Sequence, residues 1–243
     1  PEGGYGMATT ANRALAGERF WQRMAIGLAL FIFVAFAQFA FRGLADPVAA
    51  PIWVHLHALA MFGWLGLLVV QPRLAASGNR TLHRQLGWTG AALATIIVGL
   101  GIFTGFAAVI LHRQPPFFTA PYFLALTAIE AIAFGLLVYA AIRRRRATDW
   151  HRRLMLGATI IVLEPALGRV LPLPLMIGWS DIPIGLVELA VVGLIAFHDR
   201  RTIGRVHPAT IRVALAVVLT RIAVYSLALA PPVEELARRL GGG

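Results

Sequence analysis

Uninterrupted apolar segments of about 20 residues recur along almost the whole chain. A helix needs about 20 apolar residues to span the hydrocarbon core of a bilayer. Of the 243 residues, 58% are hydrophobic and only 14% are charged, and the mean hydropathy is +0.74. A soluble domain carries about 25% charged residues. The sequence therefore predicts an all-α, polytopic integral membrane protein.

Prolines, glycines and arginine runs divide these apolar segments into seven predicted transmembrane helices. The predicted helices cover residues 20–41, 52–72, 86–111, 119–142, 152–171, 182–198 and 209–230. We expect residues 1–6 and 241–243 to be non-native extensions, which leaves 7–240 as a single seven-helix transmembrane domain. Gly101 and Gly105 form a GxxxG motif, which favours close packing against another helix of the same chain.

The net charge of +11 is due to arginine, because the chain contains no lysine. Sixteen arginines lie before the first predicted helix or near the second, fourth and sixth loops, which share one side of the membrane. Five lie in the other loops and the C-terminal tail, and Arg221 lies inside the last predicted helix. The positive-inside rule then predicts a cytoplasmic N-terminus and an extracytoplasmic C-terminus. Because the arginines occupy short loops between apolar segments, the expected partners are the bilayer and its anionic headgroups, and not nucleic acid.

Ionisable side chains within the predicted spans indicate a polar pocket in the outer half of the bundle. Each such group costs about 2.5–3.5 kcal/mol on insertion scales. Candidate pocket residues at one level, roughly 8–14 Å below the outer boundary, are His57, Glu164, Glu188 and Arg221, with Glu130 deeper. Second-tier candidates are His55, His112 and Arg169. His55 and His57 lie about 200° apart around a helix, so we expect His57 to face inward and His55 to lie at the interface.

The chemistry of this pocket stays open between several classes of protein. The chain has no cysteine, so histidine and carboxylates are the expected protein ligands for a metal. They suit a divalent metal (Fe, Zn or Mn) or a b-type haem, hence a membrane oxidoreductase, although no catalytic residue can be assigned. The alternatives are a proton-coupled transporter, a polar-ligand sensor or an assembly subunit. The acids could also simply pair with Arg221 or Arg169 and lock the bundle.

A second group of polar residues lies at the cytoplasmic ends of the predicted helices. Its members, which could converge as metal ligands or as an anion site, are His83, His151, His198, Asp199 and His207. The alternative is an interfacial belt, in which the histidines bond to loop carbonyls. In that belt, Asp149 and Asp199 would pair with neighbouring arginines.

Four short motifs carry a resemblance to a known group of proteins. The segments LHRQLGW (residues 82–88), HRRLM (151–155), EPALGR (164–169) and GRVHPAT (204–210) resemble an uncharacterised family of multi-pass bacterial membrane proteins, defined by a domain of unknown function. The resemblance covers roughly the second to the seventh predicted helix. It implies a helical protein of the bacterial inner membrane, and no activity.

Overall fold

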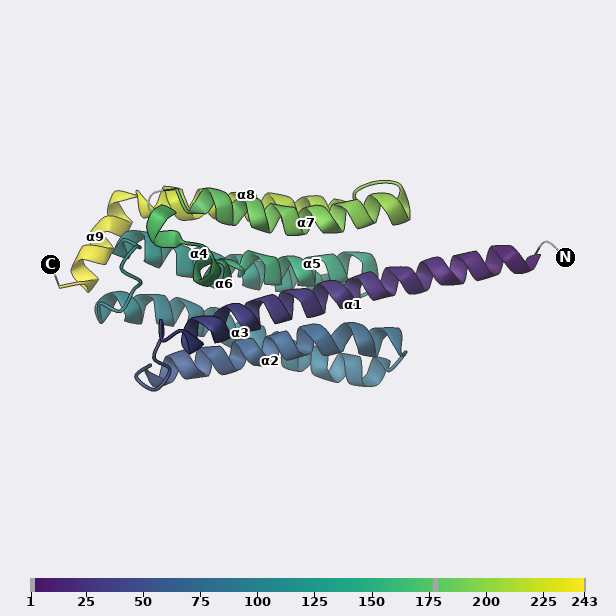
Figure 1. Ribbon diagram of the computed structural model, residues 1–243, viewed down its shortest axis with the longest axis horizontal. Helices are drawn as coiled ribbons and strands as arrows, with labels where there is room; N and C mark the ends of the chain where they lie inside the picture. The colour runs from purple at the N-terminus through teal and green to yellow at the C-terminus, as the bar shows by residue number, and fades with distance from the viewer. Residues whose placement is uncertain (1–2, 177–178, 243) are drawn as a thin grey trace.

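The computed structural model describes residues 3–176 and 179–242, and side chains from residue 18 onward apart from 173–174. The described residues form helices and no strand (Figure 1). The helices are α1 (Gly3–Phe41), α2 (Ile52–Ala76), α3 (Arg80–Ile110), α4 (Ala120–Arg143), α5 (Thr148–Ile161), α6 (Glu164–Val170), the 3₁₀ turn η1 (Leu173–Met176), α7 (Asp181–Ile203), α8 (Pro208–Ala228) and α9 (Pro231–Leu240). Of the expected non-native extensions, residues 1–2 and 243 lie outside the described residues.

Six of these helices are long and apolar enough to cross a membrane, namely α1, α2, α3, α4, α7 and α8. By the length and composition of these helices, the structure is compatible with a helical, multi-pass membrane protein. The helix predicted over 152–171 is instead divided into α5 and α6, neither of which qualifies by length. Pro165 explains the break, because its ring would clash with the carbonyl of Ile161, the residue at which α5 ends.

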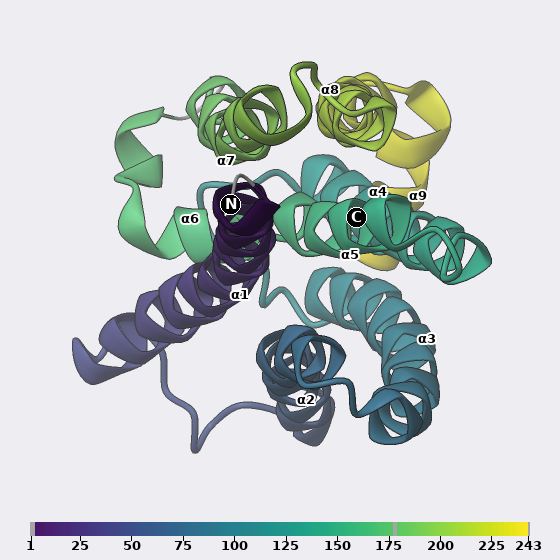
Figure 2. The ribbon, with the colours of Figure 1, turned by 90° about the vertical axis from the view of Figure 1, so that its right-hand side faces the viewer.

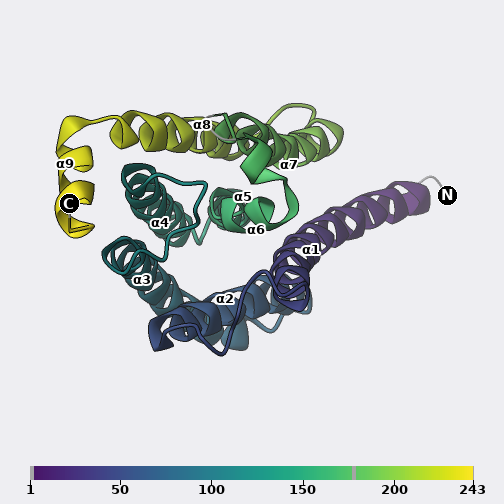
Figure 3. The ribbon, with the colours of Figure 1, turned by 60° about the vertical axis from the view of Figure 1, so that its left-hand side comes forward.

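The helices pack in layers around α4 and α5. Figures 2 and 3 show α7 and α8 on one side of this central pair, and α1, α2 and α3 on the other. One apolar core joins the layers, and within it Trp64 of α2 lies edge-on to Phe134 of α4 with ring centroids 4.9 Å apart. The indole Nε1 of Trp64 also donates to the Thr159 hydroxyl of α5 at 3.1 Å. The central pair thus supplies the most enclosed environment for polar groups.

A helix that the sequence analysis left unassigned follows the last span. It is α9, which begins at Pro231 and lies across the end of the bundle opposite the N-terminus (Figure 1). Its buried Ala237 packs with Val109 of α3 and Leu124 of α4. On its exposed side, Arg238 and Arg239 both pair with Glu235. This amphipathic pattern is typical of a helix at a membrane surface.

The GxxxG motif packs α3 against α4 within the chain. A Cβ added to Gly105 would meet the Cβ of Thr127 at 2.8 Å, closer than real side chains approach, whereas one added to Gly101 would meet Ala131 at 3.5 Å. Gly105 is therefore the glycine of the motif against which α4 packs more tightly, through the side chain of Thr127.

Replacing Gly105 with alanine is expected to destabilise the fold by about 1–3 kcal/mol, because α4 must move away to admit the methyl group. The matched control is Gly99→Ala on the same helix, where an added Cβ meets nothing within 4 Å. Thermal unfolding in detergent, followed by tryptophan fluorescence, should show a lower midpoint for Gly105→Ala only. Equal midpoints for both variants would contradict the close approach.

Candidate functional site

A single buried guanidinium, that of Arg221 in α8, contacts three carboxylates. Its Nη2 donates a short hydrogen bond to Oε1 of Glu130 in α4. Its Nε lies 3.4 Å from Oε2 of Glu188 and its Nη1 lies 3.6 Å from Oδ1 of Asp181, both in α7. The side chains of Glu130 and Glu188 are 6% and 0% exposed. Two helices, α4 and α7, thus bring three acidic groups to one cation on α8.

The acids around Arg221 extend from the bundle interior toward one end of the molecule. Asp181 is the first residue of α7, and its side chain is 20% exposed. The hydroxyl of Tyr122, near the start of α4, donates to Asp181 Oδ1 at 2.7 Å. Glu188 follows Asp181 by two helical turns, roughly 10 Å further along α7. The polar groups therefore extend from the partly exposed carboxylate of Asp181 to the fully buried carboxylate of Glu188.

Glu164 is the fourth carboxyl group of this set. It is buried in the first turn of α6, directly after the break that Pro165 imposes. It interacts electrostatically with Glu130, Arg221 and Arg169. We refer to these side chains together as the Arg221 cluster, which comprises Tyr122, Glu130, Glu164, Asp181, Glu188 and Arg221.

The cluster differs in two respects from the pocket predicted by the sequence. Arg221 pairs with Glu188, as the ion-pair alternative expected, but it also donates a shorter hydrogen bond to Glu130, which was placed deeper. A long arginine side chain reaches groups at a level other than that of its own Cα, so counting residues misjudged the depth. Asp181 and Tyr122 were missed because they stand at helix starts. The seven-residue spacing of Asp181 and Glu188, which puts both on one face of a helix, could have indicated Asp181.

The predicted histidine of the pocket, His57, is not in contact with Arg221 or its acids. It is half-buried, and its Nδ1 is enclosed without a hydrogen-bond partner among the described residues. Its ring lies beside Gly101 of α3, where Ala131 of α4 also packs. His55 is exposed. His57 of α2 thus lies beside Gly101 of α3, near Ala131, the residue that follows Glu130 on α4.

The other two second-tier residues lie at separate places. His112 follows α3 in an exposed turn, with a φ of 51°. The Arg169 guanidinium donates to the carbonyl of Pro165 at 2.5 Å and lies 3.9 Å from the ring of Phe36 in α1. Neither residue contacts the Arg221 guanidinium.

The carboxylates are grouped around a cation, and not as a set of metal ligands. Within the described ranges 3–176 and 179–242, no three or more histidine, aspartate and glutamate side chains are arranged to hold a metal ion. The arrangement that the structure does show is suited to binding protons or cations by an excess of acids.

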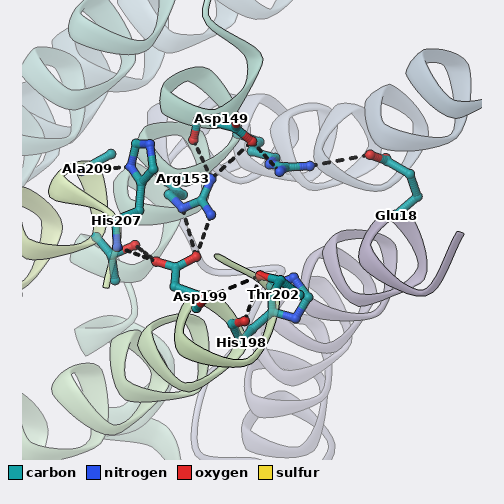
Figure 4. Close-up of polar contacts among 10 residues, drawn as sticks. Glu18, Asp149, Arg153, His198, Asp199, Thr202, His207 and Ala209 are labelled. Atoms are coloured by element: carbon teal, nitrogen blue, oxygen red, sulfur yellow. Dashed lines mark hydrogen bonds and ion pairs between the residues drawn. The ribbon is translucent and has the colours of Figure 1, made fainter. Parts of the chain in front are cut away.

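A second buried ion pair lies near the opposite end of the bundle (Figure 4). Asp199 of α7 and Arg153 of α5 are 0% and 1% exposed. The Arg153 Nε donates to Asp199 Oδ1 at 3.1 Å, and its Nη2 donates to the same oxygen. Oδ2 of Asp199 accepts from the Thr210 hydroxyl at 2.6 Å and from the backbone N–H of His207 at 3.1 Å. These four residues, the Asp199 cluster, tie α5, α7 and α8 together.

The histidines at this end do not gather with Asp199 into one site. His198 stacks on Phe20 of α1, with ring centroids 3.8 Å apart. His151 places its Nδ1 2.9 Å from the carbonyl of Ala141. His83 lies at the start of α3, where its backbone carbonyl accepts from the Gln71 side chain at 3.2 Å. The described contacts join Asp199 to the backbone of His207, while His83, His151 and His198 bond or stack with other partners, so the metal or anion site predicted for His83, His151, His198, Asp199 and His207 stays a prediction.

The two aspartate–arginine pairs expected in the interfacial belt are present. Asp149 pairs with Arg152, whose guanidinium also contacts Glu18 and lies 4.6 Å from the ring centroid of Trp21. Asp199 pairs with Arg153. The sequence analysis missed the role of Thr210, although the threonine stands in the GRVHPAT motif that it singled out.

His207 links the stability of this end to pH. Its Nδ1 accepts from the backbone N–H of Ala209 and so caps α8. Burial, followed by the positive charge of Arg153, lowers the pKa of His207 below its ordinary value of 6.5. A pKa lower in the folded state means that the unfolded chain binds the proton more readily. The contribution of His207 is thus complete above pH 6.5 and is lost as the pH falls through the lowered pKa.

We expect the His207→Asn variant to lose this dependence, because asparagine caps a helix at any pH. The midpoint of thermal unfolding should fall less for the variant than for the wild type between about pH 7.5 and 5.5. Identical falls for the two proteins would show that His207 does not titrate in this way.

Comparisons of the chain with protein-family models, with curated proteins and with solved structures find no match. The family resemblance therefore stays a prediction.

Proposed function

We propose that the protein is a proton-coupled membrane transporter and that the Arg221 cluster is its proton-binding site. The supporting observation is the charge count. One guanidinium faces four carboxyl groups inside an apolar bundle, and even with Arg169, which interacts with Glu164, two cations face four acids. An uncompensated buried charge is costly. The cluster approaches neutrality only if some of its carboxyl groups hold protons or a bound cation.

The geometry also supplies a route for those protons. Asp181 is partly exposed at the start of α7, while Glu188 and Glu130 are enclosed. All three contact the guanidinium of Arg221, so a single side chain separates Asp181 from the two interior acids. Chains of buried carboxyl groups are the usual parts of proton relays in membrane transporters.

We further propose seven membrane crossings, with α5 and α6 together forming the fifth. Both lie between α4 and α7, and jointly they cover residues 148–170. A broken helix is tolerated at membrane depth where it is enclosed by protein, as Glu164 is here. With the arginine-rich loops in the cytoplasm, Asp181 faces the extracytoplasmic side. The resembling motifs add the bacterial inner membrane as the location.

Proton flux into proteoliposomes tests the proposal. A potassium diffusion potential, negative inside, is imposed across vesicles that contain a pH-sensitive dye. We expect wild-type protein to acidify the interior and the near-isosteric Glu188→Gln variant to fall to the rate of protein-free vesicles. The matched control is Asp149→Asn, an exposed carboxylate at the other end of the bundle, which should retain the wild-type rate.

A second measurement separates a proton site from an ion-pair lock. Infrared spectra of the wild type at neutral pH should contain the carbonyl stretch of protonated carboxylic acids, and Glu188→Gln should lose part of it. If the wild type shows neither this absorption nor proton flux, the cluster only stabilises the bundle and the transporter proposal is overturned.

The redox prediction from the sequence is tested on the same preparation. A haem absorption band or a stoichiometric metal content, lost in His57→Ala, would favour an oxidoreductase over a transporter.

A further inference from the structure

A groove with a volume of about 580 Å³ lies between α1 and α6. It is formed by the face of α1 from Leu30 to Arg42 and by Arg169 and Val170 of α6. Gln38 closes its floor, since the side-chain amide donates to the backbone carbonyl of Arg169 at 2.8 Å. This hydrogen bond joins α1 to α6 across the groove.

The groove is apolar at one end and positively charged at the other, which matches the apolar tail and the anionic headgroup of a phospholipid. Leu30, Val34, Gln38 and Arg42 are four residues apart, so they form one ridge of α1. Leu30 and Val34 are 57% and 56% exposed. Along the helix, Leu30 and Arg42 are roughly 18 Å apart. One leaflet contributes about 15 Å of hydrocarbon. A phospholipid whose acyl chain lies along Leu30 and Val34 therefore has its headgroup at the level of Arg42.

The arginine end of the groove offers two guanidinium groups, Arg42 and Arg169, of which Arg169 also interacts electrostatically with Glu164. Arg42 donates to the Gln38 side chain at 3.2 Å, and Arg169 to the carbonyl of Pro165. Among the described residues, no carboxylate oxygen lies within 4.0 Å of either guanidinium. The stacking of Arg169 on Phe36 holds its guanidinium in place. Guanidinium groups bind phosphate oxygens by charge-assisted hydrogen bonds.

We propose that this groove binds one anionic phospholipid of the leaflet at the end where α1 ends. The phosphate lies on Arg42 and Arg169, and an acyl chain lies along Leu30 and Val34. The proposal depends on the shape and charge of this face and is independent of proton transport.

Native mass spectrometry of the detergent-purified protein tests the site, with phosphatidylglycerol and phosphatidylcholine of identical acyl chains. We expect phosphatidylglycerol to bind more tightly to the wild type, and Arg42→Gln to weaken its binding about fivefold, since one basic residue near a membrane surface contributes about 1 kcal/mol. The matched control is Arg113→Gln, an exposed arginine at the same end of the bundle that bonds to the carbonyl of Ala49. It should bind as the wild type does.

A second variant tests the acyl-chain half of the groove. Val34→Trp fills the groove and leaves both arginines in place, so we expect the phosphatidylglycerol adduct to be lost while the protein remains folded by circular dichroism. Unchanged binding in Arg42→Gln together with Arg169→Gln would overturn the proposal, as would unchanged binding in Val34→Trp. Equal competition by free inorganic phosphate, or dimers that phosphatidylglycerol does not displace, would show that another occupant uses this face.

Discussion

Replacing Arg221 with methionine is expected to destabilise the protein by about 3–5 kcal/mol, because it removes the one cation that three carboxylates contact. Methionine keeps most of the apolar part of the arginine side chain, so the loss of stability measures the removal of the positive charge. The midpoint of thermal unfolding in detergent, measured by tryptophan fluorescence, should fall by roughly 10 °C. The matched control is Arg212→Met on the same helix, an exposed arginine 4.7 Å from the ring centroid of Trp150. It should cost less than about 1 kcal/mol.

The acidic partners should be less sensitive than the arginine. In Glu130→Gln, Arg221 still contacts Glu188 and Asp181, so we expect a smaller loss than in Arg221→Met. The double variant should be more stable than Arg221→Met alone, since it removes one of the acids left without a cation. If Glu130→Gln were as damaging as Arg221→Met, the cluster would be a simple pair and not a cation shared by an excess of acids.

Replacing Asp199 with alanine is expected to cost a similar amount, about 3–5 kcal/mol. The substitution leaves the buried charge of Arg153 without its carboxylate and removes the acceptor for Thr210 and for the backbone of His207. The result should be a lower midpoint of unfolding and faster proteolysis of the loop between α7 and α8.

Asp149→Asn provides the control for the Asp199 cluster. Asp149 also contacts Arg153, at 3.5 Å, but its side chain is 62% exposed. Exposed pairs contribute about 0–1 kcal/mol, so this variant should unfold close to the wild type. Comparable losses in the two aspartate variants would mean that burial does not set the strength of these pairs.

The fold could be predicted from the sequence further than the site could. Six spans follow from apolar length alone, because the bilayer requires a helix to be long and apolar. The break between α5 and α6 could be located only approximately, since Pro165 predicts a kink, and whether the helix bends or ends depends on tertiary packing. The tail helix α9 is amphipathic and short, so a search for apolar length overlooks it.

The sequence predicted only some of the residues that meet around Arg221. Charged residues inside spans correctly drew attention to Glu130, Glu188 and Arg221, which contact one another or a shared partner. Which acid bonds to Arg221 depends on how α4 and α8 are rotated about their own axes. That rotation is difficult to predict from the sequence, because these helices are apolar on nearly all sides. Asp181 and Tyr122 lie at helix starts, where a polar residue is ordinary, so nothing in the local sequence sets them apart.

The long separation of Glu130 and Arg221 has a consequence for how the protein is made. The two partners are 91 residues apart in the chain. At ordinary rates of synthesis the ribosome adds the arginine roughly 5–20 s after the glutamate. During that interval the nascent α4 must enter the lipid with an acidic group and no counter-ion. The leucine, alanine and isoleucine that surround Glu130 on that helix therefore supply the insertion energy for a charge whose partner has yet to be translated.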